Sequence, residues 1–488
     1  MKGMKKWLTL SLATAMCLSV VPAPQYAREV KAAEAVMATE GTYGTYGEQL
    51  TDAQKAIYRE LQEKYLGADG LSNGVTENLV YTLETPLEYT TSEEMSTDMS
   101  TRVIKDVQYA FFAFEYDYPQ LFWMDTVKVS YGYSYSTAGD WYCVKSITVT
   151  PSGKVSVTAD SIASYNASVT AVASEITAGL SADATEYEYH KAIHDWVCET
   201  ASYNYTAAAN SNTYPEAYTS EPVFTGDGMV VCEGYGESYK ILCDQISRTT
   251  DMDLDCILIT GVGVSSNGNE NHLWNLVQFS DGKWYGVDAT WDDQQSGMQY
   301  DYLLCGKKSV CFNGRTFEAD HLADPEIVEG ITFQYPTAAE YGYNGYFAEG
   351  LTWSFKNGEL SIGGAGELPV YASEDRAPWR DYEDQITSVK IGLGITSIPE
   401  GFLGGYDAIE TLTIPFIGSH ADSANTQDAV LGHIFGRANE GTVQYYIKND
   451  GNLTCRYVVF YEKLWYIMNY YVIWRGKYGI KAYESINN

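Results

Sequence analysis

The sequence has few basic residues: 31 Lys and Arg stand against 64 Asp and Glu among 488 residues, for a formal net charge of −33. Nucleic acids and anionic membrane surfaces are bound largely through clustered Lys and Arg. The composition therefore predicts that neither is a partner. The acidic excess runs through most of the chain, which is more typical of a soluble surface than of one specific site.

Long hydrophobic runs are also scarce. The run WLTLSLATAMCLSVV, residues 7–21, is shorter than the roughly 20 residues that span a bilayer. Three lysines precede it and the small residues of VKAAEA follow it, an order typical of a signal peptide. We expect a signal peptide over residues 1–33, a secreted or cell-surface protein, and no transmembrane segment in the mature chain.

The sequence lacks paired CxxC spacings. This excludes the usual structural zinc sites, and the wide scatter of the cysteines over a long chain disfavours a dense disulfide framework. One or two isolated disulfides stay open. Apart from Cys17 in the expected signal peptide, the cysteines are Cys143, Cys198, Cys232, Cys243, Cys256, Cys305, Cys311 and Cys455.

Two or three domains are expected for a chain of this length. Helical spacing of apolar residues follows a capping box at Thr51, and two alternating segments between 122 and 153 predict strands. The overall class is α+β. The predicted parts are a signal peptide (1–33), an N-terminal α+β module (40–185), a central domain (186–325), a β-rich repeat-like domain (345–447) and a divergent aromatic tail (448–488).

The C-terminal third carries signs of a short repeat. The pair Asn357-Gly358 between alternating residues predicts a hairpin. Beyond it, ITSVKI at 386 recurs as IETLTI at 409, and the 23-residue shift lies in the leucine-rich-repeat range. One repetition cannot cover its own apolar faces, so we expect a stub that packs on the hairpin or on the preceding domain. For the tail no fold is predicted.

The stretch GDGMVVCEGYGESYK, 226–240, places Cys232 among glycines at the start of an expected helix. A helix N-terminus and a nearby imidazolium favour the thiolate form of cysteine, which is the nucleophile. Alone, the pattern is weak evidence, because a buried structural cysteine at a helix start is the commoner finding. A base is needed, and the chain has six histidines.

His272 begins NHLWNLVQFSDGKWYGVDATWDD, which predicts two strands around Asp281-Gly282, with Asp288 at the end of the second. A two-residue turn would place Asp288 on the wrong face. A three- or five-residue loop, or a bulge, brings His272 and Asp288 to one face. We therefore predict one of these loops, and a triad in which Cys232 is the nucleophile, His272 the base and Asp288 its orienting carboxylate.

These motifs, VCEGYGESYKILC, HLWN and WYGVDATWDD, resemble in order and context those of the transglutaminase-like superfamily. The resemblance covers roughly residues 186–325. It implies a papain-like α+β core and the same three catalytic roles for Cys232, His272 and Asp288. The region from Leu351 to about Tyr446 is similar to the leucine-rich repeats of BspA-like surface proteins.

A triad of this kind predicts acyl transfer through a thioester, with a protein or peptide as substrate, including cell-wall or surface proteins. Water as acceptor gives a peptidase or amidase, and a lysine amine gives a cross-link. The backbone N–H of Cys232 is one expected oxyanion donor, and Tyr218, Trp274 and Asn275 are candidates for the second. No cofactor is expected.

Two other interpretations compete with catalysis. Metal binding by Cys232, His272 and Asp288 is disfavoured by their wide spacing, so no metal site is predicted. A non-catalytic surface-binding or adhesion protein would use the fold as a scaffold and the 42 tyrosines for contacts. A complete triad favours the enzyme, because a scaffold needs none of the three groups.

Overall fold

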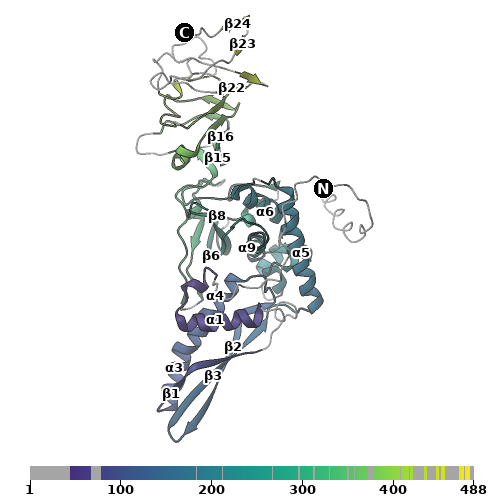
Figure 1. The fold of residues 1–488 in the computed structure, drawn as a ribbon, viewed down its shortest axis with the longest axis vertical. Coiled ribbons are helices and arrows are strands. Elements are labelled where there is room, and N and C mark those ends of the chain that lie inside the picture. Colours follow the sequence, from purple (N-terminus) through teal and green to yellow (C-terminus); the bar gives the residue numbers. More distant parts are fainter. Residues whose placement is uncertain are drawn as a thin grey trace, which may run out of the picture.

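The computed structural model describes residues 44–66 and 78–420, apart from internal gaps of one to five residues, and beyond them 433–436, 447–449, 452–456, 472–476 and 479–483. The predicted signal peptide lies outside these residues. The described chain combines helices and strands as an α+β protein. Its N-terminal sheet lies at one end, the helices around α9 in the middle and a C-terminal sheet at the other end (Figure 1).

The N-terminal region contains the predicted helix after Thr51 and the two predicted strands. Helix α1 begins after Thr51, whose side chain accepts from the Gln54 N–H while the Gln54 side chain accepts from the Thr51 N–H. Three antiparallel strands form a sheet in the order β1-β3-β2. The elements are α1 (Asp52–Tyr65), β1 (Leu79–Tyr89), α3 (Ser92–Asp98), a π-helical turn (Met99–Val103), α4 (Ile104–Asp117), β2 (Met124–Ala138), β3 (Trp141–Gly153) and α5 (Ala159–Gly179).

The N-terminal region shares one hydrophobic core with the region that follows it, because buried residues from Tyr46 to Phe333 form a single cluster. Polar contacts reinforce this junction. The Tyr46 hydroxyl donates to the carbonyl of Leu258, and buried Asp117 accepts from the backbone N–H groups of Tyr46 and Gly47. Residue 185 therefore separates two segments of the chain but not two cores.

The central region places helix α9 against a sheet of order β11-β6-β7-β8. Helix and sheet approach closely at Gly236, where a Cβ would lie 2.3 Å from Leu273 Cδ2. The longer elements are α6 (Glu186–Thr200), α9 (Cys232–Thr249), β6 (Cys256–Ser265), β7 (Gly268–Gln278) and β8 (Trp284–Val287).

Short elements complete this region. They are β4 (Ser202–Tyr203), α7 (Tyr205–Ala209), a 3-10 turn (Pro215–Tyr218), α8 (Glu221–Phe224), β5 (Met229–Val230), α10 (Ala289–Asp292), β9 (Asp293–Gln294), β10 (Gly297–Met298), α11 (Phe317–Asp320), β11 (His321–Ala323), β12 (Glu326–Val328) and β13 (Ile331–Thr332).

The β7–β8 hairpin has the odd-length loop expected from the sequence. Asn275 pairs with Val287, and the N–H of Phe279 donates to the carbonyl of Lys283. Three residues, 280–282, are left in the loop, with Gly282 at φ 77°. A three-residue loop that ends in a left-handed glycine is a common hairpin connection. This register brings His272 and Asp288 to the same face of the sheet.

The C-terminal region forms a second core around a mixed sheet of order β14-β15-β16-β18-β20-β22-β21. The predicted repeat is confirmed: β18 and β20 are parallel, and Ser388 pairs with Thr411 across 23 residues. The predicted hairpin β15–β16 lies directly beside them, because β16 pairs in parallel with β18. It thus covers one side of the repeat stub, as expected.

The strands of this region are β14 (Asn344–Ala348), β15 (Leu351–Lys356), β16 (Glu359–Gly364), β17 (Gly366–Glu367), β18 (Ser388–Ile391), β19 (Ile395–Ser397), β20 (Thr411–Ile414), β21 (Ile447–Asn449) and β22 (Asn452–Arg456). A 3-10 turn spans Arg380–Gln385. In the tail, β21 and β22 extend the sheet, and β23 (Val472–Gly476) pairs with β24 (Gly479–Tyr483). Among the described residues, no helix has the length and apolar character needed to cross a membrane.

Candidate active site

Cys232 is the first residue of helix α9, and its side chain is partly exposed. The short strand β5 leads into it, and the N–H of Val231 donates to the carbonyl of Ala217. Gly228, at φ 75°, permits this path, because a Cβ there would lie 2.3 Å from the Thr200 carbonyl oxygen. The thiol is thus held at a helix N-terminus, where the helix dipole favours an anion.

His272 and Asp288 form a buried hydrogen-bonded pair. The Nε2–H of His272 donates to Asp288 Oδ2 over 2.7 Å, and their side chains are 2% and 0% exposed. Burial disfavours the charged imidazole, but the charge and hydrogen bond of Asp288, joined by the hydrogen bond and charge of Cys232, outweigh it and raise the pKa of His272 to about 10.

The pKa of Asp288 moves the other way. Burial opposes ionisation of its carboxyl group, but the charge and hydrogen bond of His272 and the hydrogen bond of a second histidine, His321, hold the pKa well below its usual value. At neutral pH the pair is therefore an imidazolium and a carboxylate. Because Nε2 of His272 faces Asp288, Nδ1 is the nitrogen left to serve the thiol of Cys232.

A cleft of about 600 Å³ joins the nucleophile to the base, and both Cys232 and His272 line it. One wall comes from helix α4 of the N-terminal region, through Phe112 and Tyr116. Another comes from Val328 and its neighbours in β12. The structure thus brings the three predicted residues together at one end of helix α9.

A further histidine, His321, is the first residue of β11 and lies in none of the predicted catalytic motifs. Its Nε2 lies 2.9 Å from the same Asp288 oxygen, and its side chain is fully buried. It belongs to no motif and lies 33 residues beyond Asp288 in the chain. Only the antiparallel pairing of His321 with Gly263 of β6 brings it back to the site.

His272, Asp288 and His321 are also the residues that could hold a metal ion, since one donor atom of each lies within 4.8 Å of the others. The two nitrogen–oxygen separations, 2.7 and 2.9 Å, are hydrogen-bond distances. Two ligands of a tetrahedral zinc ion would lie about 3.3 Å apart. The distances therefore favour hydrogen bonds over metal coordination. The group also differs from the metal site considered from the sequence, because it contains His321 in place of Cys232.

Comparison with known proteins adds little to this geometry. No protein family profile and no curated protein matches the chain. Among solved structures, a leucine-rich repeat protein from Eubacterium ventriosum is similar over 13% of this chain and 17% of its own, with 28% sequence identity and a TM-score of 0.13. This chain therefore has a partial likeness to a bacterial leucine-rich repeat protein, which bears on neither the site nor the overall fold.

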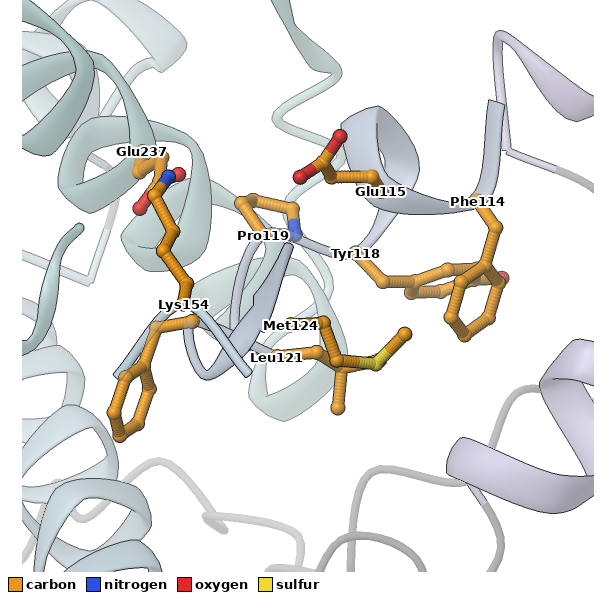
Figure 2. A pocket seen from close by; sticks show the side chains of 9 residues that line it. Phe114, Glu115, Tyr118, Pro119, Leu121, Met124, Lys154 and Glu237 are labelled. Atoms are coloured by element: carbon orange, nitrogen blue, oxygen red, sulfur yellow. The ribbon is translucent and has the colours of Figure 1, made fainter. Parts of the chain in front are cut away.

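Acidic groups and one lysine lie beside the nucleophile. Lys154 Nζ forms an ion pair with Glu233 Oε1 at 2.5 Å, and Figure 2 shows the Lys154 and Glu237 side chains pointing toward one another. Burial raises the pKa of Glu237 well above its usual value, against the charge of Lys154. The carboxyl groups of the cleft lining outnumber its positive groups, which are Lys154 and the His272 imidazolium. Its acidic residues are Glu115, Glu233, Glu237, Asp324 and Glu326, and the raised pKa of Glu237 favours the neutral form of that one residue.

The three candidates for the second oxyanion donor occupy different places. Tyr218 lines the cleft, and its hydroxyl donates to the carbonyl of Ala207. The Asn275 side chain instead donates to the carbonyl of Gly236, inside the contact between α9 and the sheet. Trp274 is buried and its ring stacks 6.0 Å from that of His272. Of the three, only Tyr218 is placed beside Cys232 in the cleft.

A second group of Cys, His and Asp side chains lies away from the cleft. His194 Nε2 is 3.0 Å from Asp292 Oδ2 and 3.7 Å from Cys198 Sγ, and all three side chains are buried. Burial raises the pKa of Cys198, which keeps this thiol neutral. Asp292 also accepts from the backbone N–H of Tyr302, so this group holds the segment after Asp288 against helix α6.

Free thiols are found at every described cysteine whose side chain is placed. These are Cys143, Cys198, Cys232, Cys243, Cys256, Cys305 and Cys311. Six of them are buried, and Cys232 is the exception. Cys232, which was predicted from the sequence to be the nucleophile, is therefore also the accessible thiol among these seven.

Proposed function

We propose that the chain is a secreted or cell-surface cysteine enzyme that acts on amide bonds of proteins or peptides, on a papain-like core of transglutaminase-like type. One observation carries the proposal: the buried hydrogen bond between His272 and Asp288, beside a cleft that His272 and Cys232 both line. A nucleophile, a base and an orienting carboxylate in this order are what covalent acyl transfer requires.

The proposed reaction has two halves. The Cys232 thiolate attacks the amide carbonyl carbon, the C–N bond breaks, and the His272 imidazolium gives its proton to the leaving amine. The product is a thioester. In the second half, water or an amine attacks the thioester, neutral His272 takes the proton from this nucleophile, and the thiolate leaves. Water gives a carboxylic acid, and a lysine amine gives a new amide.

The acidic lining of the cleft favours substrates that carry positive charge near the reacting bond. Glu115, Glu233, Asp324 and Glu326 line it. Its positive groups are Lys154, which is paired with Glu233, and the His272 imidazolium. Opposite charges attract a substrate into a cleft most strongly where the walls have a low dielectric constant. This fits an amine as acceptor or a basic segment of a peptide as donor.

The test compares three proteins: the wild type, Cys232→Ala, and Cys143→Ala as a control that removes a buried thiol from β3. Each is incubated with a complex peptide mixture and a lysine donor. Peptide cleavage, ammonia release and new isopeptide bonds are followed by mass spectrometry. We expect Cys232→Ala to lose activity by a factor of about 1,000 or more, and Cys143→Ala to keep it.

The outcome also separates the enzyme from the surface-binding alternative. If wild type and Cys232→Ala behave alike in all three readouts, the catalytic proposal fails and a non-catalytic scaffold becomes the better account. If cleavage exceeds cross-linking even with excess lysine donor, water is the preferred acceptor. The reverse ratio assigns the protein to cross-linking.

A further inference from the structure

Asp288 is shared by two imidazole rings. Its Oδ2 atom lies 2.7 Å from His272 Nε2 and 2.9 Å from His321 Nε2, and its Oδ1 atom accepts from the backbone N–H of Trp291 at 3.1 Å. The Asp288 side chain is fully buried. Three donors therefore hold one carboxylate that no bulk water reaches, and the reaction proposed above uses only one of them.

His321 is held as firmly as the carboxylate it contacts. Its Nδ1 atom is 3.2 Å from the carbonyl oxygen of Phe317, which can only accept a hydrogen bond. Its ring stacks on that of Phe317 at 4.2 Å and 16°. Burial lowers the pKa of His321, so the ring is neutral and carries a single N–H. The charged Asp288 carboxylate is a stronger acceptor than the Phe317 carbonyl, which places this hydrogen on Nε2, aimed at Asp288.

Without the His321 N–H donor, the Asp288 side chain could adopt other rotamers. Oδ2 would keep a single hydrogen-bond partner, His272, and the loss of the second donor would let the carboxylate turn. A turn of the carboxylate also turns the imidazole that is bonded to it, and Nδ1 of His272 then no longer faces Cys232. Positioning of this kind is sensitive to shifts of about 1 Å.

We propose that His321 is a positioning residue of the active site: it fixes Asp288 so that the carboxylate holds His272 aligned with Cys232. The inference rests on the proposed roles of these three residues. It assigns no contact with substrate to His321. Its effect passes through Asp288 and His272, and it should therefore be measurable as thiol reactivity, with no substrate present.

The experiment measures the rate constant for alkylation of Cys232 by iodoacetamide at pH 6.5, with the modified residue identified by peptide mass spectrometry. His321→Gln keeps an N–H donor near the position of Nε2, whereas His321→Leu fills similar space without a donor. We expect His321→Leu to lower the rate constant about 10- to 100-fold, and His321→Gln to stay within about threefold of wild type.

A matched control separates positioning from loss of a buried histidine in general. His190 is also buried, and its Nδ1 atom contacts the Tyr239 hydroxyl in the core. We expect His190→Leu to lower the melting temperature without changing the alkylation rate constant of the folded protein. Circular dichroism establishes that each variant is folded before alkylation is measured.

Two alkylation results would overturn the proposal: a wild-type rate constant in His321→Leu, or an equal loss in His321→Gln and His321→Leu. If His321→Leu does not fold, ¹⁵N-histidine spectra of the wild type decide instead. A His321 Nε2 without a bound hydrogen contradicts the inference.

The failure of this inference can be told apart from the failure of the proposed function. If the wild type turns over amides but Cys232 of His321→Leu is alkylated at the normal rate, only the inference fails. If wild-type Cys232 reacts with iodoacetamide no faster than a free peptide cysteine, both the inference and the proposed function fail.

Discussion

Replacing Asp288 with Asn removes a charge and leaves the shape nearly unchanged, which makes it the most informative single substitution. In the wild type the charge and hydrogen bond of Asp288, together with the smaller influence of Cys232, raise the pKa of His272 to about 10, from an ordinary value of about 6.5. Burial, the largest opposing influence, stays in the variant. We therefore expect the pKa of His272 to fall well below 10 in Asp288→Asn, because the main group that raises it loses its charge.

The size of the effect follows from these values. One pKa unit corresponds to about 1.4 kcal/mol, so the surroundings stabilise the His272 imidazolium by about 5 kcal/mol. Both side chains are almost fully buried, so solvent screening is small. Removing one partner of a buried ion pair costs about 3–5 kcal/mol in other proteins, which agrees. Loss of the ion pair and of the ring orientation should lower turnover about 1,000- to 10,000-fold.

The pH dependence of stability carries a definite sign. His272 has a raised pKa in the folded protein, so its contribution is complete below about pH 6.5 and is lost as the pH rises through about 10. Asp288 has a lowered pKa, so its contribution is present above about pH 4 and is lost in stronger acid. The difference in unfolding free energy between wild type and Asp288→Asn should be largest between about pH 4 and 6.5.

NMR titration of His272 and urea unfolding from pH 4 to 10 check both statements. Asp281→Asn, in the exposed loop of the same hairpin, serves as the charge-matched control and should leave the pKa of His272 unchanged. A His272 pKa that stays near 10 in Asp288→Asn would refute the reasoning. So would a stability difference that does not shrink toward pH 10.

Two further predictions concern the framework of the site. Gly228→Ala places a Cβ 2.3 Å from a backbone carbonyl oxygen, and we expect it to lower the free energy of unfolding in urea by about 3 kcal/mol. Gly139→Ala, at a similar φ but in open space, should lower it by about 1 kcal/mol. Equal losses would show that the close approach to Thr200 does not matter. Leu412 is fully buried in the centre of the repeat stub, and Leu412→Ala should lower the unfolding free energy of the C-terminal core by about 2–5 kcal/mol. The alkylation rate constant of Cys232 should stay unchanged. A slower alkylation would contradict the idea that the two cores are independent.

Local patterns predicted much of the fold. The capping box at Thr51 is a contact between residues three apart, and it is present as expected. The 23-residue shift between β18 and β20 appears in the pairing of Val389 with Leu412. The hairpin register could be worked out because His272 and Asp288 had to share a face, which only an odd loop or a bulge permits.

Contacts between distant segments could not be predicted in this way. His321 reaches Asp288 only because β11 joins the free edge of β6, and nothing in FEADHLADP indicates that pairing. The shared core is a similar case: Tyr46 and Leu258 are 212 residues apart, and neither segment shows a periodicity that names the other. The pairing of β16 with β18, at a 29-residue shift, was hidden because the repeat changes length there.

Helix α4 contributes Phe112 and Tyr116 to the cleft, far ahead of the three residues that would perform the chemistry. A fragment that began at Glu186 would hold Cys232, His272 and Asp288 but would lack the wall of the cleft that α4 provides, and it would expose apolar surface such as the Phe333 ring, on which Tyr109 packs. Selectivity for substrates would then depend partly on helix α4, which carries none of the three proposed catalytic residues. Exchange of that segment between related chains would change what is bound and leave the reaction the same.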